Sequence, residues 1–242
     1  MSTATAPGIT GLPPTTQAAL QEMTEALRAA AGDNLASVLV HGSAARGEFL
    51  EGTSDVDAIV VLKDTSLPRL DAVANALGLA RNRGRIDTMI LKLDEIEPSM
   101  DVFPVFYEEI SERHVVVYGS DPFAGLTATD EHRRLRIEQE LREAKIRTKR
   151  AAVDSMGTPR LLAAALERKV RQVRSPLRAL LKMQGVAVGD RLADVLRAAA
   201  SRYGSDAAPL LDVRRDPAAA HAAFRRLLDA AIEEVDRLEV RK

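Results

Sequence analysis

The sequence predicts an α/β domain followed by an all-helical domain. Four short runs rich in apolar and β-branched residues, at 36–41, 56–62, 85–93 and 114–118, have the length and composition of strands. Helical stretches lie between these runs. From residue 129 onward no strand pattern remains, and the apolar residues recur at helical spacing. Strands mixed with helices and then helices alone are typical of two domains of different classes.

The length of 242 residues is enough for two small domains, each with its own core. We expect a loose tail at 1–14, an α/β domain over 15–126 and a helical bundle over 127–242. Helices are expected in the first domain at 17–31 and 67–79, and in the second at 130–153, 159–184, 189–203 and 216–240.

The composition excludes several classes of site. The absence of cysteine excludes disulfides, thiolate zinc sites and iron–sulfur clusters, and four scattered histidines form no zinc motif. Aromatic residues make up only 3%, which argues against a nucleic-acid partner that stacks on them. The N-terminal stretch has neither the basic start nor the apolar core of a signal peptide, and no apolar run approaches a membrane span. We therefore expect a cytoplasmic protein without a membrane partner.

The two halves carry opposite charge. Residues 1–126 hold 9 Lys and Arg against 18 Asp and Glu, a balance of −9, whereas residues 127–242 hold 25 against 17, a balance of +8. Such an asymmetry suggests two modules with different electrostatic roles. The alternative, charges that fall unevenly on solvated faces, remains open at this point.

The strongest functional signal is the stretch HGSAARGEFLEGTSDVD. Successive side chains on a strand point to opposite faces, so Asp55 and Asp57 project together while Val56 turns away. Two carboxylates at close range repel unless a cation lies between them. Magnesium, which takes oxygen ligands and is often held by a pair of carboxylates and substrate phosphates, is the expected cation.

Other residues complete this expectation. Glycine lets a ligand approach the backbone, so Gly42, the hydroxyl of Ser43 and the amides of a following helical turn could hold phosphate. Asp87 interrupts an otherwise apolar strand and is the candidate third carboxylate, with Asp94 and Glu95 as alternatives. Three carboxylates can bind two metal ions that clamp an in-line displacement.

Together these residues resemble the signature of the nucleotidyltransferase superfamily typified by DNA polymerase β. Its pattern is Gly-Ser, a gap of about ten residues, Asp-x-Asp on a strand and a later acidic residue. Here eleven residues separate Ser43 from Asp55, and the resemblance covers residues 35–125. It implies a small mixed sheet, two magnesium ions on Asp55, Asp57 and Asp87, and terminal phosphates held by Gly42 and Ser43.

The resemblance also assigns secondary roles. Asp87 would help to deprotonate the acceptor hydroxyl, and Ser54 would touch phosphate, although a turn hydroxyl bonded to its own backbone is an equal alternative. Arg46 and Glu48 match a subset of the family, in which Arg46 would contact the nucleotide. A surface ion pair on a short helix is the alternative for these two residues.

The helical half is rich in basic residues, with 12 Lys and Arg against 3 Asp and Glu over 142–182. Its layout is similar to the helical domains that follow the catalytic domain in aminoglycoside nucleotidyltransferases. A basic stripe could form a cationic wall facing a triphosphate or a solvated face, and further candidates are Lys145, Lys149 and Lys169. The stripe consists of Arg171, Arg174, Arg178 and Lys182. Pro176 would kink the helix or begin a new one.

Two functions from different classes follow. The first is a nucleotidyltransferase that moves a nucleoside monophosphate, by family default AMP from ATP, to a hydroxyl of a small molecule or a protein and releases pyrophosphate. For a cationic acceptor, Glu108, Glu109 and Glu112 could form an acidic pocket, although the basic helical half argues against one. The second is a non-catalytic or antitoxin-like binding module that acts on a partner protein. A homodimer is an open expectation.

Overall fold

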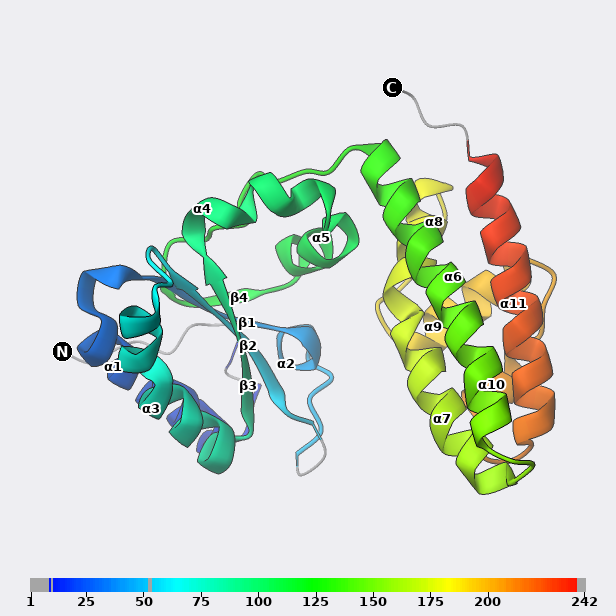
Figure 1. Cartoon of the computed structure of the whole chain (residues 1–242), viewed down its shortest axis with the longest axis horizontal. Coiled ribbons are helices and arrows are strands. Elements are labelled where there is room, and N and C mark those ends of the chain that lie inside the picture. The colour runs from blue at the N-terminus through cyan, green and yellow to red at the C-terminus, as the bar shows by residue number, and fades with distance from the viewer. Residues whose placement is uncertain (1–8, 10, 52–53, 239–242) are drawn as a thin grey trace. The chain divides into compact units, whose positions relative to one another are not determined.

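The computed structural model describes residue 9 and residues 11–51 and 54–238. These residues form two compact units (Figure 1). The sheet unit comprises the described residues up to Met100 together with Tyr107–Thr127, and the helical unit comprises Asp101–Phe106 and the described residues from Ala128 onward. The predicted fold class, a small mixed sheet with helices followed by a helical region, is confirmed.

The sheet has four strands in the order β3-β2-β1-β4. Strand β1 (Leu35–His41) is antiparallel to both β2 (Val56–Leu62) and β4 (Val115–Gly119). Strand β3 (Ile86–Lys92) is parallel to β2, and the helix α3 (Leu67–Gly84) connects the two. The four expected strands are confirmed, with ends that differ from the expectation by at most one residue.

One face of the sheet is covered by α1 (Pro14–Ala31) and α3, which pack against each other (Figure 1). Alternate strand residues such as Val38, Val40 and Val60 point into this core and are fully buried, as period-two patterning requires. Because the opposite strand residues face away from α1 and α3, polar side chains at the strand ends can gather on the other face.

The expected tail at 1–14 lies partly outside the described residues, since residues 1–8 and 10 are not described. The two residues Ile9 and Leu12 are each only 5% exposed and pack into the core beneath α1. This end of the expected tail is therefore packed, because two apolar side chains can be removed from water there.

Short elements connect the strands of the sheet unit. The turn after β1 is the helix α2 (Gly42–Arg46), and a 3-10 turn, η2 (Gly32–Asn34), precedes β1. After β3 come α4 (Leu93–Ile96), the 3-10 turn η3 (Pro98–Asp101) and α5 (Pro104–Glu112). The sequence did not predict α4 and α5 because proline residues divide this region into pieces too short to show a helical period.

The helical unit is built around α6 (Asp130–Asp154), which packs along α11 (Pro217–Arg237), as Figure 1 shows. Its core contains fully buried residues from several helices, among them Leu141, Leu166 and Phe224. The other helices are α7 (Pro159–Gln172), α8 (Arg174–Met183), α9 (Leu192–Arg202) and α10 (Ala208–Leu211).

The helix expected over 159–184 is divided in two at Val173. Proline has no N–H, so Pro176 cannot donate a helical hydrogen bond to the carbonyl of Gln172. The second helix begins at Arg174, two residues before the proline, and not at the proline itself.

Residues Asp101–Phe106 were expected in the first domain but pack with the helical unit. Val105 belongs to the core of that unit, and the guanidinium of Arg136 lies 5.7 Å from the centre of the Phe103 ring. Val105 and Phe103 of this segment thus pack against helices that begin more than 20 residues later in the chain. The expected boundary between 126 and 127 stays a prediction.

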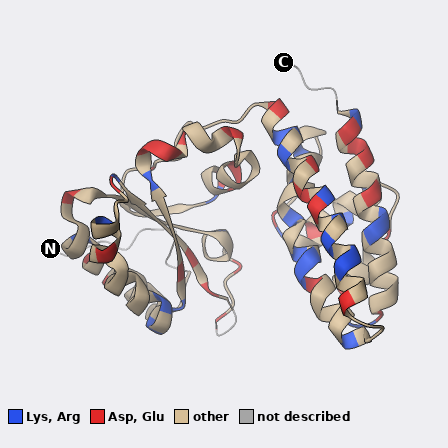
Figure 2. Cartoon of the chain, viewed as in Figure 1, with Lys and Arg blue, Asp and Glu red and all other residues tan. Residues whose placement is uncertain are grey.

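Charge differs between the units in the way that the sequence indicates. Figure 2 shows acidic residues on α4 and α5 and bands of Lys and Arg along α6 and α7. Within the described part of the chain, no helix is both long enough and apolar enough to cross a lipid bilayer.

Candidate functional site

Three polar residues lie opposite one another on adjacent strands. In the pairing registers His41 on β1 faces Asp57 on β2, and Asp57 faces Asp87 on β3. Paired residues on neighbouring strands point to the same face and lie about 5 Å apart at their Cα atoms. We call His41, Asp57 and Asp87 the polar row. It runs across the ends of three strands on the face opposite α1 and α3.

The turn after β1 closes over the middle of this row. Gly42 has a φ of +68°, and a Cβ at this position would lie 2.2 Å from the Oδ2 atom of Asp57. Glycine is therefore required both for the backbone conformation and for the close approach of the carboxylate. The half-buried Ser43 follows at once, so the Gly-Ser pair of the sequence motif stands beside the Asp57 carboxylate.

Burial and repulsion act together on the polar row. Burial raises the pKa of Asp57, and the nearby carboxylates of Asp87 and Asp55 raise it further, against the opposing effects of His41 and Arg46. Burial also lowers the pKa of His41, against the opposing effects of Asp57 and Glu109. The site thus disfavours an ionised Asp57 unless additional positive charge is supplied.

The first carboxylate of the motif points to a different partner. The Nε atom of Arg85 donates to Oδ1 of Asp55 at 2.8 Å, and both side chains are about half exposed. Arg85 is the residue after α3 and has a φ of +51°. The crossover helix therefore ends by placing a cation on the carboxylate that the motif assigns to metal.

The remaining motif residues contact other groups of the sheet unit. Arg46 is only 16% exposed and makes ion pairs with Glu48 at 3.1 Å and with Glu109 on α5 at 3.5 Å. Ser54 accepts a hydrogen bond from the backbone N–H of Leu50 at 3.1 Å, which is the turn arrangement considered from the sequence. The Ser54 hydroxyl keeps its own proton for donation.

A second histidine lies next to the row. His114 directly precedes β4, where Val115 pairs with Val40, so it adjoins His41 on the neighbouring strand. Its Nδ1 lies 2.8 Å from the carbonyl oxygen of Ile110, and its Nε2 lies 3.2 Å from Asp121. The Ile110 carbonyl and the Asp121 carboxylate, on either side of the ring, fix its orientation.

Sequence reasoning did not identify Arg85 or His41 as parts of the site, and it considered Glu109 only for an acidic acceptor pocket. Arg85 and Glu109 follow no local pattern, because their partners lie 30 and 63 residues away in the chain. His41 carried one usable signal, its position as the last strand residue before the Gly-Ser pair. Asp94 and Glu95, the alternatives to Asp87, lie on α4 and not on β3.

The donor set fits a hard divalent cation in its chemistry. Every candidate ligand is a carboxylate, and the ionised form of Asp57 needs positive charge. As the side chains stand, no group of three His, Asp or Glu among the described residues is arranged to hold a metal ion. To join a metal site, the Asp55 carboxylate would have to exchange Arg85 for the metal.

The basic candidates of the helical half are mostly committed to other partners. Arg178 forms an ion pair with Asp190 at 2.6 Å, with each side chain only 14% exposed, and Arg174 donates to the carbonyl of Asp190 at 3.1 Å. Lys145 pairs with Asp229 on α11 at 2.6 Å. Arg174, Arg178 and Lys145 therefore form contacts within the helical unit. For the two stripe residues, Arg174 and Arg178, neither alternative drawn from the sequence anticipated this role.

Comparison with known proteins agrees with this geometry. The family model described as "Nucleotidyltransferase domain" matches residues 20–152, more than half of the chain. Among solved structures, the chain is similar to spectinomycin adenyltransferase AAD(9) from Enterococcus faecialis, whose crystal structure contains ATP and spectinomycin. The two are 14% identical with a TM-score of 0.50, and the match covers 91% of this chain and 99% of the other. This likeness concerns the fold. No curated protein matches the sequence.

Proposed function

The chain belongs to the nucleotidyltransferase domain family, and we propose that it transfers AMP from ATP to a hydroxyl group and releases pyrophosphate. The observation that carries this proposal is the polar row beneath the Gly42 turn. It combines a backbone that approaches a half-buried carboxylate closely with a second carboxylate in register beside it. Such a site can hold phosphate and cation side by side.

Magnesium would be held by Asp57 and Asp87, with Asp55 joining after it leaves Arg85. When bound, the metal would neutralise charge on the phosphoryl oxygens and so stabilise the transition state. The Gly42–Ser43 turn would position the terminal phosphates through its backbone amides and the Ser43 hydroxyl. Arg46, held by Glu48 through Nε and by Glu109 through Nη1, would orient the turn, and its remaining guanidinium N–H groups would contact the nucleotide.

The proposed reaction is an in-line displacement. The acceptor oxygen forms a bond to the α-phosphorus of ATP, and the bond from that phosphorus to the oxygen bridging to the β-phosphate breaks. Pyrophosphate leaves with the bonding electron pair, and the acceptor proton passes to a carboxylate, for which Asp87 is the candidate. Most of the catalysis would come from positioning and electrostatics.

A small molecule is the acceptor that we favour over a protein. The structural neighbour is an adenyltransferase for spectinomycin, which makes spectinomycin a reasonable first probe although the likeness is one of fold. Acidic side chains on α5 support a basic acceptor, since Glu109 is close enough to influence His41 in the polar row. Glu108 and Glu112 lie on the same helix.

Calorimetric titration tests the donor site directly. ATP, GTP, CTP and UTP, each with magnesium, would be titrated into the wild type and into Asp55→Ala/Asp57→Ala. We expect tight, magnesium-dependent binding of ATP that is lost in the double variant. Spectinomycin would then be added with ATP, and transfer would be followed by pyrophosphate release and by the mass of the product.

The alternative is a binding module that acts by contact on a partner protein. The ion pair between Asp55 and Arg85 favours this alternative, because it leaves the motif without a ready metal site. If no nucleotide binds to the wild type with or without spectinomycin, the proposed transfer is wrong and the binding module is favoured.

A further inference from the structure

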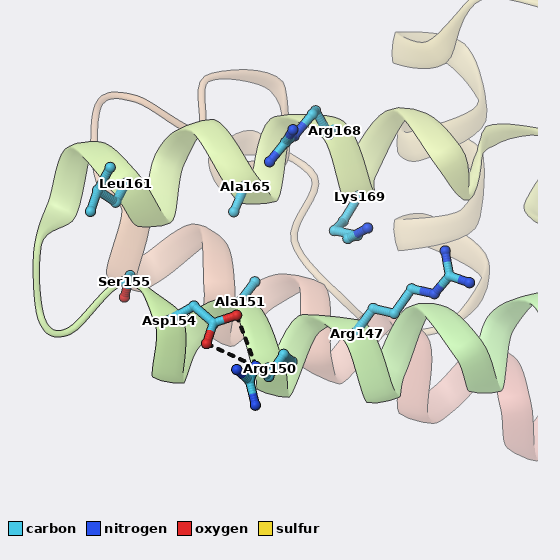
Figure 3. Close-up of a pocket in the computed structure, with 9 residues that line it drawn as sticks. All are labelled: Arg147, Arg150, Ala151, Asp154, Ser155, Leu161, Ala165, Arg168 and Lys169. Atoms are coloured by element: carbon cyan, nitrogen blue, oxygen red, sulfur yellow. Dashed lines mark hydrogen bonds and ion pairs between the residues drawn. The ribbon is translucent and has the colours of Figure 1, made fainter.

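A cationic groove lies within the helical unit, between the second half of α6 and α7 (Figure 3). Its volume is about 380 Å³, within the range of small-molecule sites. Every residue that lines it belongs to these two helices or to the turn that joins them, so the groove is complete without the sheet unit. Arg147 of α6 and Arg168 and Lys169 of α7 give the groove its charge.

These three cations are poorly neutralised. Figure 3 shows Lys169 and Arg147 extending from opposite helices toward the space between them. The carboxylate in the lining, Asp154, is taken by Arg150 at 2.8 Å. Lys169 donates to the neutral amide of Gln172, and Arg168 makes no ion pair within the part of the chain that the structure describes. Arg147 alone has a carboxylate, Glu143, at 3.1 Å.

The positive charge of the groove is not balanced by nearby carboxylates. The pKa of Lys169 is lowered, first by burial and then by repulsion from Arg147 and Arg168. On α6, arginines pair with acidic residues one turn away, as Arg136 does with Glu140 at 2.6 Å and Arg147 does with Glu143. Arg168 and Lys169 have no such carboxylate partner among the described residues, so a ligand of high negative charge would stabilise these two cations.

We propose that this groove binds the polyphosphate chain of a small ligand. Arginine presents a planar fork that matches phosphate oxygens, and a lysine supplies a point charge, so the three cations suit several adjoining phosphates better than one carboxylate. Leu161, which is 51% exposed, and Ala165 form an apolar side of the groove that can contact the rest of a nucleotide. This site is separate in residues from the polar row, and it does not depend on the proposed transfer reaction.

The test uses the full chain and inorganic tripolyphosphate without magnesium. Calorimetry would compare the wild type with Arg168→Gln/Lys169→Gln and with a matched control, Arg225→Gln/Arg226→Gln. The control removes two adjacent arginines from the exposed face of α11 in the same unit. We expect binding that weakens steeply with salt, falls at least about tenfold in the groove variant and is unchanged in the control.

Further arms identify the source of the phosphates and guard against misfolding. The same titrations with ATP, in an Asp55→Asn/Asp57→Asn background, would show a nucleotide ligand if affinity again depends on Arg168 and Lys169, and a free polyphosphate if it does not. The charge-conserving Arg168→Lys/Lys169→Arg should retain tripolyphosphate binding. The proposal is overturned if the wild type does not bind tripolyphosphate, if the groove variant binds as the wild type does, or if the control loses as much affinity.

Discussion

The two units collect opposite charges, and they differ in how those charges are balanced. In the helical unit most cations on α6 find a carboxylate one turn away, as Arg134 does with Glu138. In the sheet unit the pairing of β2 with β3 places Asp57 and Asp87 opposite each other whatever their charge. A helix face lets a long side chain choose among neighbours at i+3 and i+4, whereas strand register imposes one neighbour.

The contrast shows which charged residues are informative about function: those whose charge is not balanced by a neighbouring residue. Like charges held opposite each other by register are costly, and a bound cation would relieve that cost. A charge run on a helix is mostly balanced within the helix, so the exception is informative. In the part of this chain that the structure describes, the cationic groove at Arg168 and Lys169 is such an exception.

The largest expected effect comes from Asp57, at the centre of the polar row. Replacement by asparagine keeps the volume but removes the charge, so we expect magnesium-dependent ATP affinity to fall at least about 100-fold. Calorimetry would measure it, with Asp71→Asn on the exposed face of α3 as a control that should bind normally. If Asp57→Asn bound ATP and magnesium as the wild type does, the Asp57–Asp87 pair would not be the magnesium site. The contrast between the two units would then say nothing about function.

The next effect concerns Gly42. An alanine Cβ would lie 2.2 Å from the Asp57 carboxylate in a backbone conformation that L-residues disfavour, so Gly42→Ala should destabilise the protein by about 1–3 kcal/mol and weaken ATP binding. Denaturant unfolding would measure the loss. Gly78→Ala is the matched control, since Gly78 lies within α3 with open space around it, and it should stabilise by about 0.5–1 kcal/mol. If Gly42→Ala and Gly78→Ala changed the free energy of unfolding equally, the close approach of the Asp57 carboxylate to Gly42 would be contradicted.

The third effect is the pH dependence of stability. The folded-state pKa of Asp57 is raised above its unfolded value, so its contribution to stability is full below the unfolded pKa and is lost as pH rises through the folded pKa. Without magnesium, Asp57→Asn should therefore raise the Tm at pH 7, by about 2 °C, and the gain should vanish near pH 3. Thermal unfolding from pH 3 to 8 measures this. If the wild type and Asp57→Asn had the same Tm at pH 7, the destabilising effect of burial and of the neighbouring carboxylates on ionised Asp57 would be contradicted.

Magnesium should reverse this difference. Added to the wild type at pH 7, it should raise the Tm because the cation binds the folded carboxylates, and chelation with EDTA should remove the gain. Asp57→Asn should respond much less. A magnesium response of the same size in both proteins would place the cation elsewhere.

The smallest effect is expected at Arg85. Its ion pair with Asp55 is half exposed, so Arg85→Gln should change the free energy of unfolding by less than about 1 kcal/mol. Magnesium affinity, measured by calorimetry with ATP present, should increase a few-fold, since Asp55 no longer has to exchange a partner. A decrease in affinity would show that Arg85 supports the bound state.

The sequence by itself determined the strands, most of the helices, the fold class and the Asp-x-Asp and Gly-Ser pairs, because these depend on local periods of two and 3.6 residues and on glycine geometry. Only the tertiary structure decided that Asp87 stands level with Asp57, that His41 completes the row and that Arg85 holds Asp55. The tertiary structure also decided that Arg178 forms an ion pair with Asp190 and that Lys169 lies in the cationic groove. These contacts join residues distant in the chain, and strand register and helix packing, which the whole core sets, bring them together.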